Sequence, residues 1–395
     1  MINYDEAYAN VLRYTFDFGV ETVALLESNG RILAEEVLAD RDFPPFDRAT
    51  KDGIAIDSKA LEKGLERFKI EGLASAGMGQ QQLHDFHHCI EVMTGAIVPE
   101  NADTVIMYEH VTIADGYATL LQEARKGQDI HVQGSDVVLG TVLLPRNSRI
   151  GPAEIGILAS VGKSEVQVRK MPKVCVVSTG NELVAVAETP LPHQIRRSNA
   201  LSLCAALQKE KIEAFSIHLK DDKASIKKEL DHLLKTYDVV LLSGGVSKGK
   251  FDFIPEVMES LAVQKVFHRV AQKPGKPFWF GIQPELKTVV FSFPGNPVST
   301  FANYHVYFLP WLYRSMDIEI PKTEVVFDGT LQVHPPLTRF VQVSTENKKG
   351  VLWASPVREN GSGDLTSLAL SDGFICLRPR DKAYEKGELV PYIST

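Results

Sequence analysis

The chain has few cysteines, no long apolar run and no excess of basic residues, and each absence excludes a class of protein. Its four cysteines lie far apart and form no C-x-x-C pair, which is typical of a reduced, cytoplasmic protein rather than a disulfide-stabilised one. The first residues show no basic stretch followed by an apolar one, so no signal peptide is predicted. No apolar run is long enough to span a bilayer, so we expect no membrane contact.

The charge balance also narrows the choice of partner. The formal net charge is −7, from 43 Lys and Arg against 50 Asp and Glu. Proteins that act mainly on nucleic acid need a basic face, so we expect no nucleic-acid partner. A small anionic ligand needs only local positive charge and stays compatible with this balance. At 395 residues the chain is too long for one core, so two to four domains are expected.

The longest regular pattern lies between residues 171 and 320, where short β-branched runs alternate with helical stretches. This pattern predicts a doubly wound, mostly parallel α/β sheet that is covered on both faces. In such sheets ligands bind outside the carboxyl ends of the strands. The strand candidates that end in turns rich in glycine, lysine or carboxylates are 174–178, 215–220, 238–242 and 288–293.

The rest of the chain divides around this region. We expect a first helix over 4–15, capped by Asn3, and a hairpin of runs 20–26 and 31–37 at Asn29-Gly30, although the second run also fits a helix. Further helices are expected at 152–161 and 298–314. The expected domains are an α/β domain (1–19 and 171–320), a linking and dimerisation domain (20–45 and 139–170), a mainly β domain (46–138) and a C-terminal β-barrel (321–395).

The turn after 238–242 contains Ser243, Gly244, Gly245 and Ser247, and its glycine and lysine spacing approaches that of a nucleotide P-loop. Phe251 stands where that loop needs a Ser or Thr for magnesium. We therefore favour a phosphate-cradling loop of another type, because glycines let the backbone approach an anion closely. A flexible strand-to-helix turn remains the alternative.

Carboxylates and lysines occupy the neighbouring strand ends. Glu182, Asp252 and one of Asp221-Asp222 are candidate Mg²⁺ ligands, although an Asp at a helix start is often only a cap. Lys273-Pro274-Gly275-Lys276-Pro277 places two cations on a stiff loop, which favours anion binding. We interpret the histidines of His84-x-x-His87-His88-Cys89 as a polar turn before a strand, with zinc binding as the weaker alternative.

Six blocks of sequence together resemble the molybdopterin molybdenumtransferase family, which includes bacterial MoeA and the E-domain of gephyrin. The resemblance covers essentially the whole chain. The blocks, in order, are Phe46-Asp47-Arg48-Ala49-Thr50-Lys51-Asp52-Gly53, Met93-Thr94-Gly95-Ala96-Ile97-Val98-Pro99, Ser178-Thr179-Gly180-Asn181-Glu182-Leu183, Ser243-Gly244-Gly245-Val246-Ser247, Lys273-Pro274-Gly275-Lys276-Pro277-Phe278 and Phe293-Pro294-Gly295-Asn296-Pro297-Val298-Ser299.

The resemblance implies an Mg²⁺-dependent transferase that inserts molybdate into adenylylated molybdopterin, releasing AMP and forming molybdenum cofactor. It implies a homodimer whose cleft lies between the α/β domain of one subunit and the β domain of the other. It also implies transient contact with the adenylyltransferase partner and with molybdoenzymes. Its catalytic residues would be Asp52, Thr94, Glu182 and Asp252; its metal ligands Glu182, Asp222 and Asp252; and its pterin-phosphate pocket Ser243, Gly244, Gly245, Ser247, Lys273, Lys276, Pro294 and Pro297.

Three departures from the family pattern stand out. Lys51 and Ile54 replace the usual Met and Tyr, Asn181 replaces a common Asp, and residues 128–136 lack the usual arginine, for which Lys51 is a candidate substitute. The alternatives are a non-catalytic molybdopterin-binding scaffold, a tungstate-specific insertase and a nucleotide-dependent kinase that uses residues 244–250.

Overall fold

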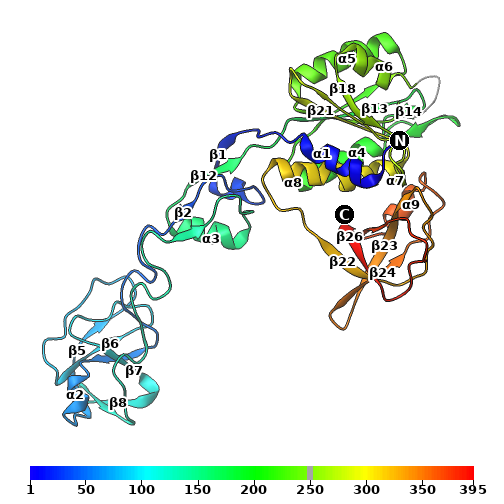
Figure 1. Cartoon of the computed structure of the whole chain (residues 1–395). Helices are drawn as coiled ribbons and strands as arrows, with labels where there is room; N and C mark the ends of the chain where they lie inside the picture. The colour runs from blue at the N-terminus through cyan, green and yellow to red at the C-terminus, as the bar shows by residue number, and fades with distance from the viewer. Residues whose placement is uncertain (247–251) are drawn as a thin grey trace.

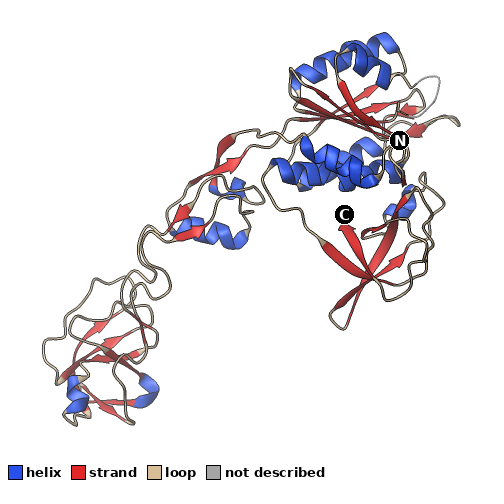
Figure 2. Cartoon of the chain, viewed as in Figure 1, coloured by secondary structure: helices blue, strands red, loops and turns tan. Residues whose placement is uncertain are grey.

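The molecule is extended, with a β-rich unit at one end, a narrow waist, and an α/β unit beside a small barrel at the other end (Figure 1). The computed structural model describes residues 1–246 and 252–395. Figure 2 shows that helices concentrate around the α/β sheet, whereas the other parts consist mainly of strands and loops.

The α/β unit is built on a six-stranded sheet in the order β16-β13-β17-β21-β20-β18. The first four strands are parallel to one another, and β20 pairs antiparallel with both β21 and β18, which confirms the mostly parallel sheet. The strands are β13 (Val174–Thr179), β16 (Phe215–Leu219), β17 (Val239–Ser243), β18 (Gln264–His268), β20 (Trp279–Gln283) and β21 (Thr288–Phe293).

Helices cover both faces of this sheet (Figure 1). One face carries α1 (Tyr4–Arg13), α4 (Asn199–Lys209), α7 (Pro297–Asn303) and α8 (Leu309–Ser315), and the other carries α5 (Lys223–Thr236) and α6 (Ile254–Ser260). Alternation along β13 serves both cores, since Val174 and Val176 pack on the first side and Cys175 and Val177 on the second. The side chain of Asn3 accepts a hydrogen bond from Glu6 N at 2.8 Å, so the expected cap of the first helix is confirmed.

The helix expected over 298–314 is interrupted. A π-helical turn, η3 (Tyr304–Phe308), separates α7 from α8. Pro310 explains the interruption, because proline has no N–H to donate to Val306 four residues earlier and its ring would collide with that carbonyl in an α-helix. The wider π turn keeps the segment continuous.

The β-rich unit contains a second six-stranded sheet, in the order β7-β4-β6-β5-β9-β8. A Cβ at Gly53, the first residue of β4, would lie 1.9 Å from the carbonyl oxygen of Ile106, so this close pairing with β7 requires glycine. The strands are β4 (Gly53–Ile56), β5 (Arg67–Ala74), β6 (His88–Val92), β7 (Thr104–Met107), β8 (Val111–Ala114) and β9 (Tyr117–Leu120), joined by α2 (Lys59–Glu62) and η2 (Tyr108–His110), with the pair β3 (Arg48–Ala49) and β10 (Ile130–His131) beside them.

The waist is formed by segments far apart in sequence. The elements are β1 (Val20–Ala24) paired with β12 (Glu165–Arg169), β2 (Val37–Leu38) paired with β11 (Val142–Leu144), η1 (Leu25–Ser28) and α3 (Pro152–Ser160). The expected hairpin at Asn29-Gly30 is therefore wrong. Asn29 has φ −60° and Gly30 φ +84°, which is a type II turn, whereas the two-residue hairpin turns I′ and II′ both need positive φ at the first position.

The C-terminal part is a closed five-stranded barrel, as expected. Its order is β23-β24-β22-β26-β25, and β25 pairs back with β23. The elements are β22 (Thr323–Phe327), β23 (Thr338–Lys348), β24 (Val351–Pro356), α9 (Leu365–Leu368), β25 (Gly373–Leu377) and β26 (Leu389–Ser394). The short strand β19 (Gln272–Lys273) pairs with β23 and so ties the lysine loop to the barrel. Across residues 1–246 and 252–395, none of the helices has the length and apolar character needed to cross a membrane.

Candidate functional site

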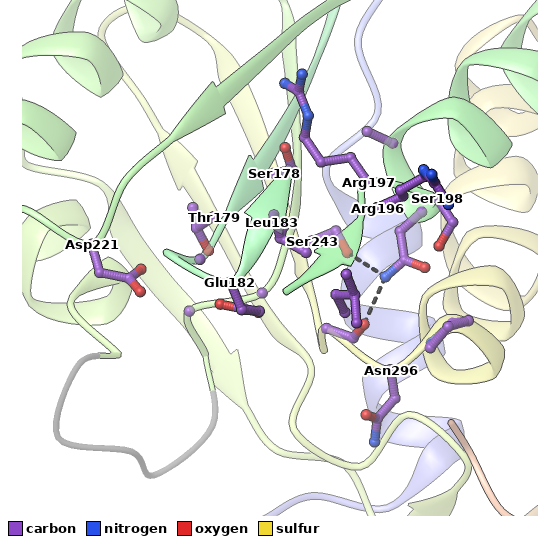
Figure 3. Close-up of a pocket in the computed structure, with 18 of the residues that line it drawn as sticks. Ser178, Thr179, Glu182, Leu183, Arg196, Arg197, Ser198, Asp221, Ser243 and Asn296 are labelled. Atoms are coloured by element: carbon purple, nitrogen blue, oxygen red, sulfur yellow. Dashed lines mark hydrogen bonds between the residues drawn. The ribbon is translucent and has the colours of Figure 1, made fainter. Parts of the chain in front are cut away.

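A cavity of about 350 Å³ opens at the carboxyl ends of β13, β17 and β21. Figure 3 shows Asp221 and Glu182 on one side of it and Arg196, Ser198 and Asn296 on the other. The sequence places ligand-binding groups here because parallel strands all end at this edge and each is followed by a polar turn. The lining residues are Ser178, Thr179, Gly180, Glu182, Leu183, Ile195, Arg196, Arg197, Ser198, Asn199, Ala200, Asp221, Ser243, Gly244, Gly245, Asp252, Gly295, Asn296 and Pro297.

Three carboxylates line this cavity: Glu182, Asp221 and Asp252. Asp222, the member of the Asp pair expected to bind metal, instead caps α5, because its Oδ1 accepts a hydrogen bond from Ser225 N at 2.8 Å. Asp221 is held at the cavity wall by a reciprocal pair of hydrogen bonds with Asn181, of 3.1 and 3.2 Å. The sequence offered both aspartates, and only the cap geometry separates their roles.

The glycine turn lies against the end of β13. Gly244 and Gly245 have φ +103° and +71°, and a Cβ at Gly244 would lie 2.9 Å from the carbonyl oxygen of Thr179. The Thr179 hydroxyl is buried there and makes no hydrogen bond within the described residues. The turn thus presents backbone rather than side chains to the cavity. Ser247, the remaining residue expected in this loop, lies outside the described residues.

A second cavity of about 240 Å³ adjoins the first, because Gly295 and Asn296 line both. It contains the two lysines of the expected anion-binding loop, Lys273 and Lys276, together with Pro294. Pro297 lines the first cavity instead. The glycine turn, the carboxylates and the lysine loop, which are separated in sequence, therefore meet at one edge of the sheet.

Buried amides hold the lysine loop in place. Gln272 Nε2 donates to the carbonyl of Pro274 at 2.9 Å and to Asn303 Oδ1 at 2.8 Å. Asn303 Nδ2 donates to the carbonyl of Gly275 at 3.3 Å, and the Tyr307 hydroxyl donates to Gln272. Gln272 and Asn303 are fully buried, so these bonds are shielded from water.

The sequence interpretation missed two arginines. The short pair β14 (Leu183–Val184) and β15 (Ile195–Arg196) forms a flap beside the first cavity and carries Arg196 to its wall, followed directly by Arg197. Arg196 Nε donates to the carbonyl of Glu188, and Arg197 forms no ion pair in the part of the chain that the structure describes. Two adjacent arginines before a helix are a signal that could have been read as anion-binding.

Asp52 and Thr94 lie together, but beside the other sheet, in the turns next to the start of β4 and the end of β6. The backbone N–H and hydroxyl of Thr94 both donate to Asp52 Oδ1, at 2.6 and 2.7 Å. The backbone N–H of Thr94, followed by its hydroxyl, holds the pKa of Asp52 below its ordinary value. Within one chain the sheet beside them lies across the waist from the cavities (Figure 1).

The arginine-poor segment 128–136 lies beside this pair. His131 contacts the guanidinium of Arg48 through Nδ1 at 3.0 Å and Asp136 through Nε2 at 2.8 Å. Arg48 is therefore a cation beside this segment that sequence reasoning missed. Lys51 is exposed. Elsewhere in this unit, His84 N and His88 Nδ1 bond the two oxygens of Glu71.

The chain matches three family models. They are "MoeA N-terminal region (domain I and II)" over residues 2–162, "Probable molybdopterin binding domain" over 175–314 and "MoeA C-terminal region (domain IV)" over 325–395. It is 39% identical to the molybdopterin molybdenumtransferase of Synechocystis, over 95% of both chains. It is 31% identical to that of Bacillus subtilis, over 98% of this chain and 92% of the relative.

Solved structures agree. The fold is similar, with a TM-score of 0.85 and 30% identity, to a molybdopterin biosynthesis MoeA protein from Pyrococcus horikosii, covering 100% of this chain and 99% of that one. The similarity therefore includes all parts of the molecule.

Proposed function

The chain belongs to the MoeA family of molybdopterin molybdenumtransferases, and from this premise we propose that it inserts molybdate into adenylylated molybdopterin, releasing AMP and forming molybdenum cofactor. One observation carries the proposal: carboxylates, a glycine turn and two lysines meet at the same sheet edge in two adjoining cavities. A phosphorylated pterin suits such a combination, since its phosphates need lysines and backbone N–H groups, whereas the carboxylates can hold a cation that neutralises the phosphates.

Each group has a role that its chemistry suits. Lys273 and Lys276 attract the phosphates of the substrate, and the backbone of the glycine turn approaches them closely. Glu182 and Asp252 accept protons or direct a water to the phosphate, which makes them the proposed catalytic residues. The fixed positions of these groups supply most of the rate, because little covalent chemistry is required of the protein.

We include Mg²⁺ as the cofactor. The described residues contain no ready cluster of three His, Cys, Asp or Glu side chains that would hold a metal by themselves. This suits Mg²⁺, which usually keeps waters and binds one or two carboxylates together with substrate phosphates. Glu182, Asp221 and Asp252 would hold the ion, and Asp221 replaces Asp222 in this proposal. When bound, the ion would neutralise the pyrophosphate charge.

We further propose a homodimer. The waist exposes large apolar side chains on β2, on β11 and between them in sequence, namely Leu38, Val138, Leu139 and Val142. Such a group is unusual on a surface that faces water. A twofold assembly through the waist would bring the Asp52–Thr94 pair of one subunit to the cavities of the other. Four domains with boundaries near residues 19, 45, 138, 170 and 320 belong to the same proposal.

A cytoplasmic location and transient contact with an adenylyltransferase and with molybdoenzymes complete the proposal. The cysteines support a reducing compartment, because Cys89, Cys175, Cys204 and Cys376 are all unpaired.

The experiment is a reconstitution with adenylylated molybdopterin, Mg²⁺ and molybdate, in which AMP release is measured. Wild-type protein should release AMP only when molybdate is present. Asp252→Ala should stop release while thermal unfolding is unchanged. Substrate binding without AMP release would instead indicate a scaffold, and faster release with tungstate than with molybdate would indicate a tungstate insertase.

A further inference from the structure

Asn199, the first residue of α4, lines the first cavity between the flap and the sheet. Its amide nitrogen faces three acceptors: the carbonyl of Gly295 at 2.7 Å, Ser243 Oγ at 2.9 Å and Thr300 Oγ1 at 3.4 Å. A carbonyl can only accept, so the atom beside Gly295 must be the nitrogen of the amide. The orientation of Asn199 is therefore determined by its surroundings.

The hydroxyls beside Asn199 can also be oriented. Thr300 Oγ1 donates its proton to the carbonyl of Pro294 at 2.6 Å, so it must accept from Ser243 Oγ at 3.3 Å. Ser243 then accepts from Asn199. The result is a directed chain of hydrogen bonds from Asn199 through Ser243 and Thr300 to Pro294, which lines the second cavity. This chain fixes the starts of α4 and α7 to the end of β17.

One atom of Asn199 is left over. Its Oδ1 accepts no hydrogen bond from the described residues, although the side chain lines the cavity. Nearby, Gly244 and Gly295 line the cavity with backbone alone, since neither residue has a side chain. A flat ring can lie against such a wall, and an acceptor at its edge selects for a ring that carries a donor.

We propose that Asn199 Oδ1 accepts a hydrogen bond from the exocyclic amino group of the ligand's ring and so determines specificity for an aminated heterocycle. Phosphate and molybdate oxygens are acceptors themselves and gain nothing from this atom. The inference rests on the proposed function, whose substrate carries two such groups, one on the pterin and one on the adenine. Both rings offer an exocyclic amino group as donor, and the experiment below distinguishes the pterin from the adenine.

The test measures dissociation constants for two pairs of probes. Pterin is compared with its 2-desamino analogue, and AMP with purine riboside 5′-monophosphate, so that in each pair hydrogen replaces the amino group. In the wild-type protein one amino-bearing probe should bind about tenfold more tightly than its partner, as expected for one added hydrogen bond in a desolvated site. The pair that shows the preference identifies the ring.

Two variants separate recognition from support. Asn199→Ala should abolish the preference, leaving a ratio near one. Thr300→Val breaks the hydrogen-bond chain but lines neither cavity, so it should keep the preference even if both affinities fall. Equal binding within both pairs by wild-type protein, no binding of any probe, or a preference that survives Asn199→Ala would overturn the inference. Loss of the preference in both variants would show that Asn199 only supports the loops, and would overturn it too.

The inference and the proposed function have separate readouts, so the failure of one can be told from the failure of the other. Molybdate-dependent AMP release tests the function itself, and wild-type activity without any amino-group preference would refute the inference alone.

Discussion

Replacing Asn303 by Ala should loosen the lysine loop without touching any group that contacts substrate. The substitution removes the donor to the carbonyl of Gly275 and one of the two acceptors of Gln272 Nε2, which keeps its bond to Pro274. The main loss is thus one buried carbonyl left without a partner, because Asn303 is fully buried. Such a group costs about 1–3 kcal/mol.

This cost appears in one of two forms. If the loop stays closed, the free energy of unfolding falls by about that amount. If the loop opens to hydrate the carbonyl, the same energy must be supplied when substrate closes it, and about 1.4 kcal/mol corresponds to a tenfold higher KM. We expect the second form, because the loop borders a cavity that water can enter.

The assay compares KM for adenylylated molybdopterin, from AMP release, with urea unfolding of the same variant. Gln283→Ala is the matched control, since Gln283 is also a buried amide with hydrogen bonds to Leu261, Glu285 and Leu286 but lies at the opposite edge of the sheet. It should lose stability and keep the wild-type KM. The reasoning is refuted if Asn303→Ala is as destabilised as the control yet has an unchanged KM.

The remaining predictions concern single carboxyl or imidazole groups. Asp222→Ala should lower the free energy of unfolding by about 1 kcal/mol through loss of a helix cap and should retain activity, which urea unfolding and AMP release measure. Asp221→Asn should raise the Mg²⁺ concentration needed for half-maximal AMP release, which an Mg²⁺ titration measures. Thr94→Val should raise the pKa of Asp52 toward its ordinary value, because one of its two hydrogen bonds is lost; the carboxyl carbon shift in an NMR titration measures this. The stability that this bond contributes is present above the unfolded pKa and is lost as the pH falls through the folded one. Burial lowers the pKa of His305 to about 3. Between about pH 6.5 and 3 the unfolded chain therefore takes up a proton that the folded one does not, and the free energy of unfolding should fall by up to about 1.4 kcal/mol for each unit by which the pH is lowered. His305→Phe should flatten this slope when urea unfolding is measured across the pH range.

The sequence predicted the elements of the fold where local pattern and tertiary structure agree. The four parallel strands were visible because buried strands are short, β-branched runs followed by glycine or carboxylate turns. The pairing of β1 with β12 was not, since a partner more than a hundred residues away leaves no local signal. The π turn at η3 was not predicted either, although Pro310 within the expected apolar helix was a signal that the helix would be interrupted.

For the site, the sequence indicated residue types and their gathering at one edge, but not their individual orientation. Asp221 and Asp222 are equivalent in pattern, and only the bond to Ser225 N distinguishes the cap from the cavity wall. Asn199 was missed because an Asn at a helix start reads as a cap. Its role depends on acceptors contributed by two distant loops.

The central claim is that one chain's cavities are completed by the Asp52–Thr94 pair of a second chain, and complementation tests it most directly. Asp52→Ala and Asp252→Ala chains carrying different tags are co-expressed, and the mixed dimer is isolated through both tags. Each homodimer should be inactive, whereas the mixed dimer keeps one intact cleft of two and should release AMP at about half the wild-type rate. A mixed dimer as inactive as the two parents would contradict the claim.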